Sequence, residues 1–309
     1  VGRGILLNRQ LLPVMSLLFL FLDGIGIAEA GEENPFAGDW AGWERLSGGV
    51  PWTEPWVEVD EPGLVRRGID ANLGLDGLPQ SGTGQATLFS GVNCAERAGR
   101  HFGPYPHSTS KPVLTARSIF LTAMRQGKTA AFANAYPSPF FQFVRKRNRW
   151  TVTTLMAVEA GVQLRTSEDL QAGTAIPANI TGKGWPDGGI GAISEEVAAL
   201  RLANLSAQHD LTLFEYYLTD KAGHKQDLAN AAKVIGSLDR FFEALVGVLS
   251  PDITIVLTSD HGNLEDLSTK SHTRNPVPFV ARGPAADAFK EVRSLVDVAG
   301  AVGSALMRG

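Results

Sequence analysis

Cysteine is nearly absent from this sequence. The chain has 309 residues and a single cysteine, Cys94, which excludes an internal disulfide and a metal site built from several thiolates of one chain. The lack of paired cysteines favours a reducing compartment.

Positive charge and long apolar runs are also scarce. The formal net charge is −4, so no overall field attracts the protein to nucleic acid or to anionic membranes. After Leu22 no apolar run approaches the roughly 20 residues that a membrane-spanning helix needs. The one basic run, residues 145–149, is expected to be a solvated face, with a phosphate-attracting rim as the alternative. These features predict neither a nucleic-acid partner nor a membrane partner.

One apolar run lies near the start of the sequence, over residues 11–22, and it allows two interpretations. Two arginines precede it, Arg3 and Arg9, as in a signal peptide that directs export. However, the run ends in Asp23 and a glycine-containing turn, which is typical of a strand buried on both faces. If the strand is correct, residues 1–14 are expected to be a disordered extension.

Strand-like runs alternate with helical patterns along the rest of the chain. Helical spacing of apolar residues begins after the capping serine Ser194 and again near Gln226. This alternation predicts an α/β fold with a mostly parallel central sheet and helices on both faces. The expected strands are residues 16–22, 129–134, 211–217, 253–258 and 277–281.

Two stretches interrupt this alternation. Residues 31–65 are rich in glycine, proline and tryptophan and are expected to form a packed surface flap, with a substrate-facing lid as the alternative. Residues 136–192 mix aromatic, basic and Gly/Pro segments and are expected to form a small inserted cap. The predicted core then consists of residues 15–135 and 193–309.

Acidic and histidine side chains follow several of the expected strands. Asp260 and His261 come directly after one strand, while Asp220 and His224 follow another with the spacing of one helical turn. Open α/β sheets build their sites at the carboxyl ends of strands. Together the acids and histidines are numerous enough to bind two divalent cations. The metal-competent residues are Asp23, Asp220, His224, Asp260, His261 and His272.

A glycine-rich stretch over residues 78–91 offers a hydroxyl nucleophile for such a site. Either Ser81 or Thr83 would lie where a helix begins, and the backbone N–H groups there favour an anionic oxygen. A bound cation lowers the pKa of a coordinated hydroxyl and makes it a better nucleophile. Without the metal ligands, the same residues would be interpreted as an ordinary helix start.

Four short runs resemble the alkaline phosphatase superfamily of metalloenzymes, and within it the cofactor-independent phosphoglycerate mutases and the phosphopentomutases. The runs are DGIG at 23–26, DKAGH at 220–224, TSDHGN at 258–263 and HTRNPVP at 272–278. Their order and spacing are specific, and they cover both ends of the chain. The resemblance implies an alkaline phosphatase-like core.

The resemblance also implies roles for particular residues. The implied ligand sets are Asp220, His224 and His272 for one cation, and Asp23, Asp260 and His261 for the other. Relatives place the nucleophile at a fixed distance before the glycine of an LLTG-like run, and counting back from Gly91 gives Ser81. Thr83 becomes the second choice. Gln85 stands where the mutases have a histidine.

The implied function is phosphoryl transfer on a small phosphorylated substrate through a phosphoserine intermediate, by a phosphomutase-like enzyme or a phosphatase. The alternatives are a phosphodiesterase or sulfatase-type hydrolase of the same superfamily, and a non-catalytic metal-binding relative. Oxygen and nitrogen ligands without sulfur suit Mn²⁺ or Zn²⁺, and the mutase-like runs favour Mn²⁺. The candidate substrate contacts are Asn93, Arg100, His101 and Lys111.

The implied ligand sets decide between the two interpretations of the N-terminal apolar run. Because Asp23 ends that run and completes the second set, residues 16–22 are expected to be a buried strand. A cytoplasmic location follows by default. Export is the alternative, if residues 11–22 act as a signal.

Overall fold

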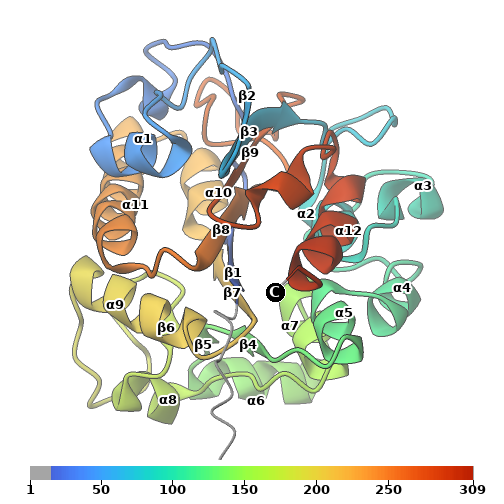
Figure 1. The fold of residues 1–309 in the computed structure, drawn as a ribbon, viewed down its shortest axis with the longest axis vertical. Helices are drawn as coiled ribbons and strands as arrows, with labels where there is room; N and C mark the ends of the chain where they lie inside the picture. The colour runs from blue at the N-terminus through green and yellow to red at the C-terminus, as the bar shows by residue number, and fades with distance from the viewer. Residues whose placement is uncertain (1–14, 309) are drawn as a thin grey trace, which may run out of the picture.

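The computed structural model describes residues 15–308, and its centre is a mixed sheet with the strand order β2-β3-β9-β8-β1-β7-β4. Helices cover both faces of this sheet (Figure 1). The predicted α/β fold is therefore confirmed. The strands of the sheet are β1 (Ser16–Leu22), β2 (Val59–Glu61), β3 (Leu64–Ile69), β4 (Ala130–Phe132), β7 (Leu211–Tyr216), β8 (Ile253–Thr258) and β9 (Val277–Arg282).

Strand β1 lies in the middle of the sheet, parallel to β7 on one side and to β8 on the other. Its residues are all buried. Phe19 and Phe21 belong to the hydrophobic cluster on one face of the sheet, whereas Leu20 and Leu22 belong to the cluster on the opposite face. Since both faces are covered, the strand is apolar without alternation. The expected disordered extension, residues 1–14, lies outside the described residues.

The direction of the strands brings several loops to one edge. The sheet is parallel from β4 through β7 and β1 to β8, and antiparallel from β8 through β9 and β3 to β2. Strand β9 therefore begins at the edge where β8 ends, and β3 ends at this same edge. We call it the carboxyl edge. The loops after β1, β3, β7 and β8 and the loop before β9 all meet there.

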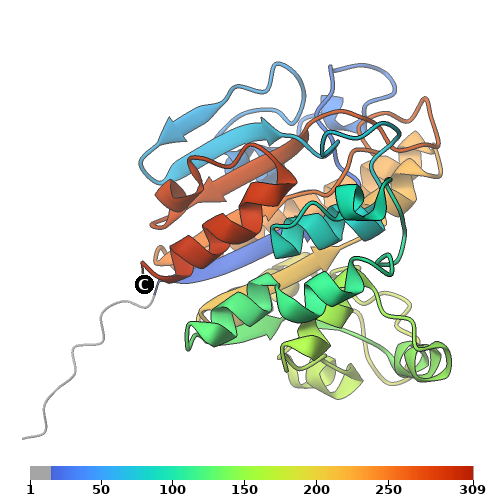
Figure 2. The same ribbon diagram turned by 90° about the vertical axis from the view of Figure 1, so that its right-hand side faces the viewer.

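Two layers of helices enclose the sheet, and Figure 2 shows α12, α2 and α5 side by side on one of them. This layer comprises α2 (Ser81–Ser90), α3 (Cys94–Ala98), α4 (Lys111–Ala116), α5 (Ile119–Arg125), α7 (Val152–Glu159) and α12 (Leu295–Leu306). The other comprises α1 (Ala41–Ser47), α9 (Glu195–Ser206), α10 (Leu218–Gly223) and α11 (Leu228–Val248). Within residues 15–308, no helix is both long enough and apolar enough to cross a lipid bilayer.

The segment predicted as an inserted cap occupies two different environments. Helices α6 (Ser138–Arg147) and α8 (Ser167–Ala172) lie beyond the β4 end of the sheet with the short pair β5 (Asn134–Ala135) and β6 (Ile176–Pro177) (Figure 1). In contrast, α7 from the same segment packs against α2, α4 and α5 in the main core. The division into a core and a cap stays a prediction.

The tryptophan-rich segment is packed against the core. Trp43 and Trp52 meet edge to face with 4.5 Å between ring centroids, and Trp43 packs in the same way on Phe242 of α11 at 4.9 Å. All three side chains are buried. The packing agrees with a flap that is fixed to the α11 layer. Strands β2 and β3, which the alternation pattern does not predict, begin at the end of this segment.

Candidate metal centre

The predicted metal ligands meet at the carboxyl edge of the sheet. Asp23 follows β1, and Asp260 and His261 follow β8, whereas Asp220 lies in α10 after β7 and His272 precedes β9. With His224, these side chains form two groups of three. In each group the possible ligand atoms all lie within 4.8 Å of one another.

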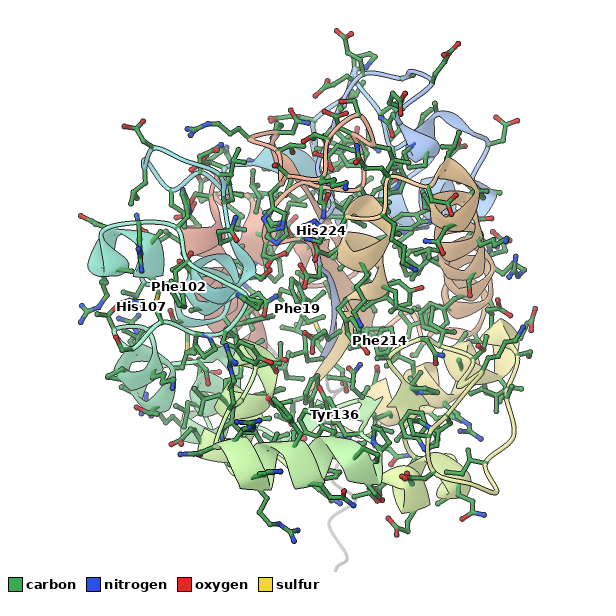
Figure 3. All side chains as sticks on the ribbon, turned by 180° about the vertical axis from the view of Figure 1, so that it is seen from behind. Phe19, Phe102, His107, Tyr136, Phe214 and His224 are labelled. Carbon is green, nitrogen blue, oxygen red and sulfur yellow. The ribbon has the colours of Figure 1, made fainter. Side chains whose placement is uncertain are left out.

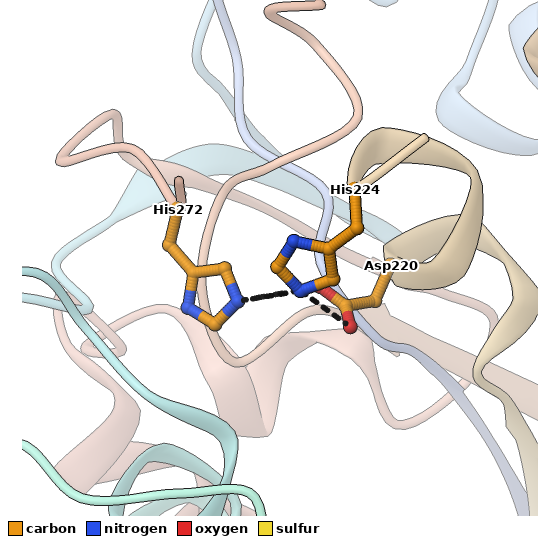
Figure 4. A group of neighbouring side chains, drawn as sticks. All are labelled: Asp220, His224 and His272. Atoms are coloured by element: carbon orange, nitrogen blue, oxygen red, sulfur yellow. Dashed lines mark hydrogen bonds and ion pairs between the residues drawn. The ribbon is translucent and has the colours of Figure 1, made fainter. Parts of the chain in front are cut away.

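The first group consists of Asp220, His224 and His272 (Figure 4). His272 Nε2 lies 3.3 Å from His224 Nε2 and 3.4 Å from Asp220 Oδ1, and His224 Nε2 lies 3.3 Å from Asp220 Oδ2. On the far side of each ring, Nδ1–H donates to a backbone carbonyl. His224 donates to Lys270 and His272 donates to Pro79, each at 2.7 Å. Since a carbonyl oxygen only accepts, the neutral rings carry their protons on Nδ1 and direct the lone pairs of Nε2 into the group.

The charges of the first group attract a proton or a cation. Burial alone would raise the pKa of Asp220, but the hydrogen bond with His272 and the nearby His261 hold this pKa well below its ordinary value. Burial opposes protonation of His272, and the Asp220 carboxylate outweighs it and raises the pKa of His272. Asn263 Nδ2 also donates to Asp220 Oδ1 at 2.7 Å. An anionic carboxylate beside two imidazole nitrogens suits a divalent cation.

The second group consists of Asp23, Asp260 and His261, all buried. His261 Nε2 lies 3.3 Å from Asp23 Oδ1 and 3.6 Å from Asp260 Oδ2. Across the described part of the chain, no hydrogen-bond donor reaches either of these two carboxylate oxygens. Burial and the charge of Asp220 raise the pKa of Asp260 to about 7, and burial lowers the pKa of His261 to about 3. These residues lack a positive charge among them, so they fit a divalent cation.

Ser81 is the first residue of α2, and its hydroxyl faces the second group. Ser81 Oγ lies 3.0 Å from His261 Nε2. The other ring nitrogen of His261, Nδ1–H, donates to the Gly262 carbonyl at 3.3 Å, so the Ser81 hydroxyl is the donor to Nε2. One turn along α2, Gln85 Nε2 donates to Asp23 Oδ2 at 3.3 Å. The start of α2 thus contacts two members of the group.

Thr83, the second choice for a nucleophile, is directed elsewhere. Its Oγ1 lies 3.3 Å from the backbone carbonyls of Gln80 and Phe102, and it accepts from the Phe102 N–H at 3.1 Å. The side chain is fully buried. The hydroxyl of Thr83 is therefore used inside the fold and is not brought to the ligand groups.

Glu265, which none of the sequence motifs identifies, ties the loops of the site together. Its buried carboxylate accepts from the backbone N–H of Gly26 at 2.7 Å and of Asn263 at 2.8 Å, and from the hydroxyl of Thr273. These partners belong to the loops after β1, after β8 and before β9. The only signal in the sequence is an acidic residue two positions after the DHGN run.

Two of the predicted substrate contacts, Asn93 and Lys111, line neither of the cavities that contain Ser81. Asn93 caps α3 by accepting from the Glu96 N–H at 3.0 Å, and it donates to the Leu73 carbonyl at 3.0 Å. Its amide is therefore engaged within the fold. Lys111 is exposed at the start of α4. Their role as substrate contacts stays a prediction.

Arg100 and His101 line a cavity of about 540 Å³ beside the site. This cavity shares Gln80 with a cavity of about 330 Å³ that contains Ser81, His224 and His272. The two predicted contacts therefore adjoin the site without touching Ser81.

Another cavity that reaches Ser81 has a volume of about 510 Å³ and is lined by aromatic residues of α6 and neighbouring loops. None of the sequence motifs assigns these aromatic residues to the site. The only signal for them is the mixture of aromatic and basic residues at 140–149.

The part of the chain that carries five of the six possible ligands is similar to known metalloenzymes. A family model described as the Metalloenzyme superfamily matches residues 192–307. A 2,3-bisphosphoglycerate-independent phosphoglycerate mutase of Halobacterium salinarum is 37% identical over 90 residues, which are 27% of this chain and 18% of that protein. A phosphopentomutase of Mycoplasmopsis pulmonis is 38% identical over 58 residues, which are 19% of this chain and 15% of that protein. The chain thus spans less than a fifth of either mutase.

The fold has known counterparts over nearly its whole length. The structure of an alkaline phosphatase from the Antarctic bacterium TAB5 superimposes with a TM-score of 0.54 and 12% identity, covering 95% of this chain and 98% of that one. At this identity the match concerns the fold alone. The Metalloenzyme superfamily model thus matches the C-terminal part of the chain, residues 192–307, and the alkaline phosphatase-like fold extends over nearly the whole chain.

Proposed function

We propose that this protein is a two-metal phosphoryl-transfer enzyme that acts on a small phosphate monoester, with Ser81 as the nucleophile. The observation that carries the proposal is the distance of 3.0 Å between Ser81 Oγ and His261 Nε2, directly beside the two groups of ligands. A hydroxyl at the start of a helix, next to buried carboxylates with free oxygens, is the arrangement that metal-activated oxygen nucleophiles require.

The two groups would hold one cation each, the first through Asp220, His224 and His272 and the second through Asp23, Asp260 and His261. Carboxylate oxygens and imidazole nitrogens suit Mn²⁺ or Zn²⁺, and the similarity to the mutases favours Mn²⁺. When bound, the cations supply positive charge that lowers the pKa of the serine hydroxyl and stabilises a transferring phosphoryl group.

The residues of the chain have separate roles in the proposed phosphoryl transfer. Ser81 Oγ loses its proton and forms a bond to phosphorus, while the bond from phosphorus to the ester oxygen breaks and the alcohol leaves with a proton. Asp23 is held in place by Gln85 during this step. Attack of water on the phosphoserine would release inorganic phosphate, whereas attack of a second hydroxyl of the same substrate would give an isomer. The products therefore distinguish a phosphatase from a mutase.

A cytoplasmic location is part of the proposal. It is supported by the similarity to the mutases and by the use of residues 16–22 as a central strand.

The variant Ser81→Ala tests the nucleophile. We expect it to lose turnover of phosphate monoesters in the Mn²⁺-loaded protein and to yield no phosphorylated peptide containing residue 81 after an acid quench. Metal content should stay nearly unchanged, because Ser81 contributes one hydroxyl to a site with two carboxylates and an imidazole. The control Ser304→Ala changes an exposed serine of α12. Undiminished turnover by Ser81→Ala would exclude Ser81 as the nucleophile.

A further inference from the structure

The cavity of about 510 Å³ beside Ser81 combines a polar end with an aromatic end. Four residues of the candidate metal centre line the polar end. At the other end lie side chains of α6, of the loops around it and of the segment after β7. We call this space the aromatic cavity. Its lining residues are Asp23, Ser81, Gln85, Asp220, Pro104, Tyr105, Tyr136, Pro137, Phe140, Phe143, Arg149, Thr151, Glu215, Tyr217 and Lys221.

Tyr136 and Phe140 form an aromatic wall of the cavity. Their rings are stacked, with 4.2 Å between centroids and 29° between planes. Figure 3 shows Tyr136 beside helix α6, which carries Phe140 and, one turn further, Phe143. The Phe143 side chain is 43% exposed, although it is a large apolar group. The inner faces of the two rings cover each other, so another flat ring can stack on an outer face of this pair or pack against its edge.

Two cations of the aromatic cavity are each placed over an aromatic ring. The Arg149 guanidinium lies 3.9 Å from the ring centroid of Tyr105, and Lys221 Nζ lies 4.5 Å from that of Tyr217. Both cations are otherwise exposed to solvent. They add positive charge near the place where a phosphate would approach Ser81, without adding a hydrogen-bonding surface deep in the cavity.

The lining of the aromatic cavity also contains three acidic residues. Glu215 is buried in the wall, and its Oε2 already accepts from the Thr153 hydroxyl at 2.7 Å. Asp23 and Asp220 are the other two acids. An uncharged ring meets no electrostatic penalty beside buried Glu215, and the other two acids belong to the ligand groups.

We propose that the aromatic cavity binds the alcohol portion of phosphate monoesters in which that portion carries a flat, uncharged aromatic ring. The inference rests on the proposed function, because Ser81 must receive the phosphate end of the ester. The ring then lies against the stacked pair of Tyr136 and Phe140, and the phosphate lies beside Ser81. Stacking on this wall predicts binding roughly tenfold tighter, or more, than for an ester with a short alkyl group.

Calorimetric binding of two phosphonates to the Mn²⁺-loaded protein tests the cavity without turnover. Benzylphosphonate should bind at least tenfold more tightly than methylphosphonate. In Phe140→Ala this preference should fall to about twofold or less, and Phe140→Tyr, which keeps a ring, should retain it. The matched control is Phe141→Ala, which removes a ring from the same helix at a residue that does not line the cavity. Equal binding of the two phosphonates by the unaltered protein would overturn the proposal, as would an undiminished preference in Phe140→Ala.

Turnover of benzyl phosphate and ethyl phosphate separates this proposal from the proposed function. Both esters release simple alcohols, so a higher kcat/KM for the benzyl ester reports recognition of the ring. Turnover of both esters at equal kcat/KM, with equal phosphonate binding, would refute the ring site and leave the proposed function standing. Turnover of neither ester, with the phosphonate preference intact, would refute the proposed function and leave the ring site standing.

Discussion

Asp260 has a buried carboxylate that no positive charge among the described residues balances. Its side chain is fully buried, Oδ2 has no donor among the described residues, and burial with the charge of Asp220 raises its pKa to about 7. In Asp260→Asn the amide keeps the shape and removes the charge. We therefore expect loss of one tightly bound Mn²⁺ per chain and of activity together, measured by metal analysis after dialysis and by turnover.

The same substitution has an opposite consequence for the metal-free protein. Because Asp260→Asn removes a buried charge that no cation then balances, the chelator-treated variant should be at least as stable as the unaltered protein near pH 8, measured by urea unfolding. The control Asp252→Asn, in an exposed turn before β8, should change neither property. Unchanged metal content in Asp260→Asn would remove this residue from the ligand set.

Glu215 gives a pH dependence of stability that can be isolated by substitution. Burial raises the pKa of Glu215 from 4.5 to about 7. Between these two pH values the folded state holds a proton that the unfolded state has lost, so the contribution of Glu215 to stability falls as the pH rises through this window. Glu215→Gln removes this loss and keeps an oxygen that can accept from Thr153.

The expected gain of Glu215→Gln is therefore small near pH 4 and grows to as much as about 3 kcal/mol near pH 8. Urea unfolding of both proteins across this range measures the difference. A difference that does not change with pH would contradict the assignment of the raised pKa to Glu215.

Site residues that belong to a sequence motif were predictable from the sequence. Residues whose role depends on contacts between distant segments were not. Asp23, Asp220 and Asp260 each follow a strand or lie within a specific run, so their type and position identify them. Glu265 gives no such signal, because its importance comes from three loops that lie far apart in the sequence and meet only in the fold. Phe140 likewise gives no signal, since an aromatic residue on a short helix most often belongs to the hydrophobic core.

At the scale of elements, the direction of β9 explains how His272 reaches the site. His272 precedes a strand, and in a fully parallel sheet that position would lie at the edge opposite to Asp260. Because β9 is antiparallel to β8, its start lies beside the end of β8. In the same way β3, which the alternation pattern misses, ends at the carboxyl edge and leads to Ser81. Strand direction depends on pairing between distant segments, so the local pattern of apolar residues does not contain it.

The closeness of α2 to the loop after β8 depends on a glycine. A Cβ atom built on Gly84 would lie 2.9 Å from the Asp260 backbone oxygen and 3.3 Å from its Cβ. Gly84→Ala should therefore push the helix and the loop apart by a few tenths of an ångström. We expect weaker Mn²⁺ binding and at least tenfold lower kcat/KM, because placement of catalytic groups is sensitive to shifts of this size.

A second helical glycine provides the control for this prediction. Gly247 lies in α11, and a Cβ atom there would meet no atom within 4 Å. Gly247→Ala should leave metal binding and activity unchanged and should raise stability by about 0.5–1 kcal/mol, because alanine favours the helix. If Gly84→Ala binds Mn²⁺ as tightly as Gly247→Ala, the close approach of α2 is not needed for the site.

At the scale of the whole molecule, the hydrophobic core and the candidate metal ligands occupy different parts of the fold. The two hydrophobic clusters lie on opposite faces of the sheet, whereas the ligands lie at one edge, on loops that leave the core. Such loops open more easily than buried strands. The continuous apolar strands made the core predictable from the sequence. The predicted cap, residues 136–192, was harder to delimit from the sequence, because α7 lies within it and packs in the core.

This arrangement predicts that the metal ions stabilise the whole chain by binding only to its folded form. The first group joins His224 to His272 across 48 residues of sequence, so an unfolded chain does not present it. At Mn²⁺ concentrations about 100-fold above Kd, the stabilisation from one site is about 2.7 kcal/mol, which corresponds to a rise of several degrees in Tm. Scanning calorimetry with Mn²⁺ and with a chelator measures this rise. In His272→Ala it should be clearly smaller, and an equal rise in both proteins would show that Mn²⁺ stabilises the chain at some other place.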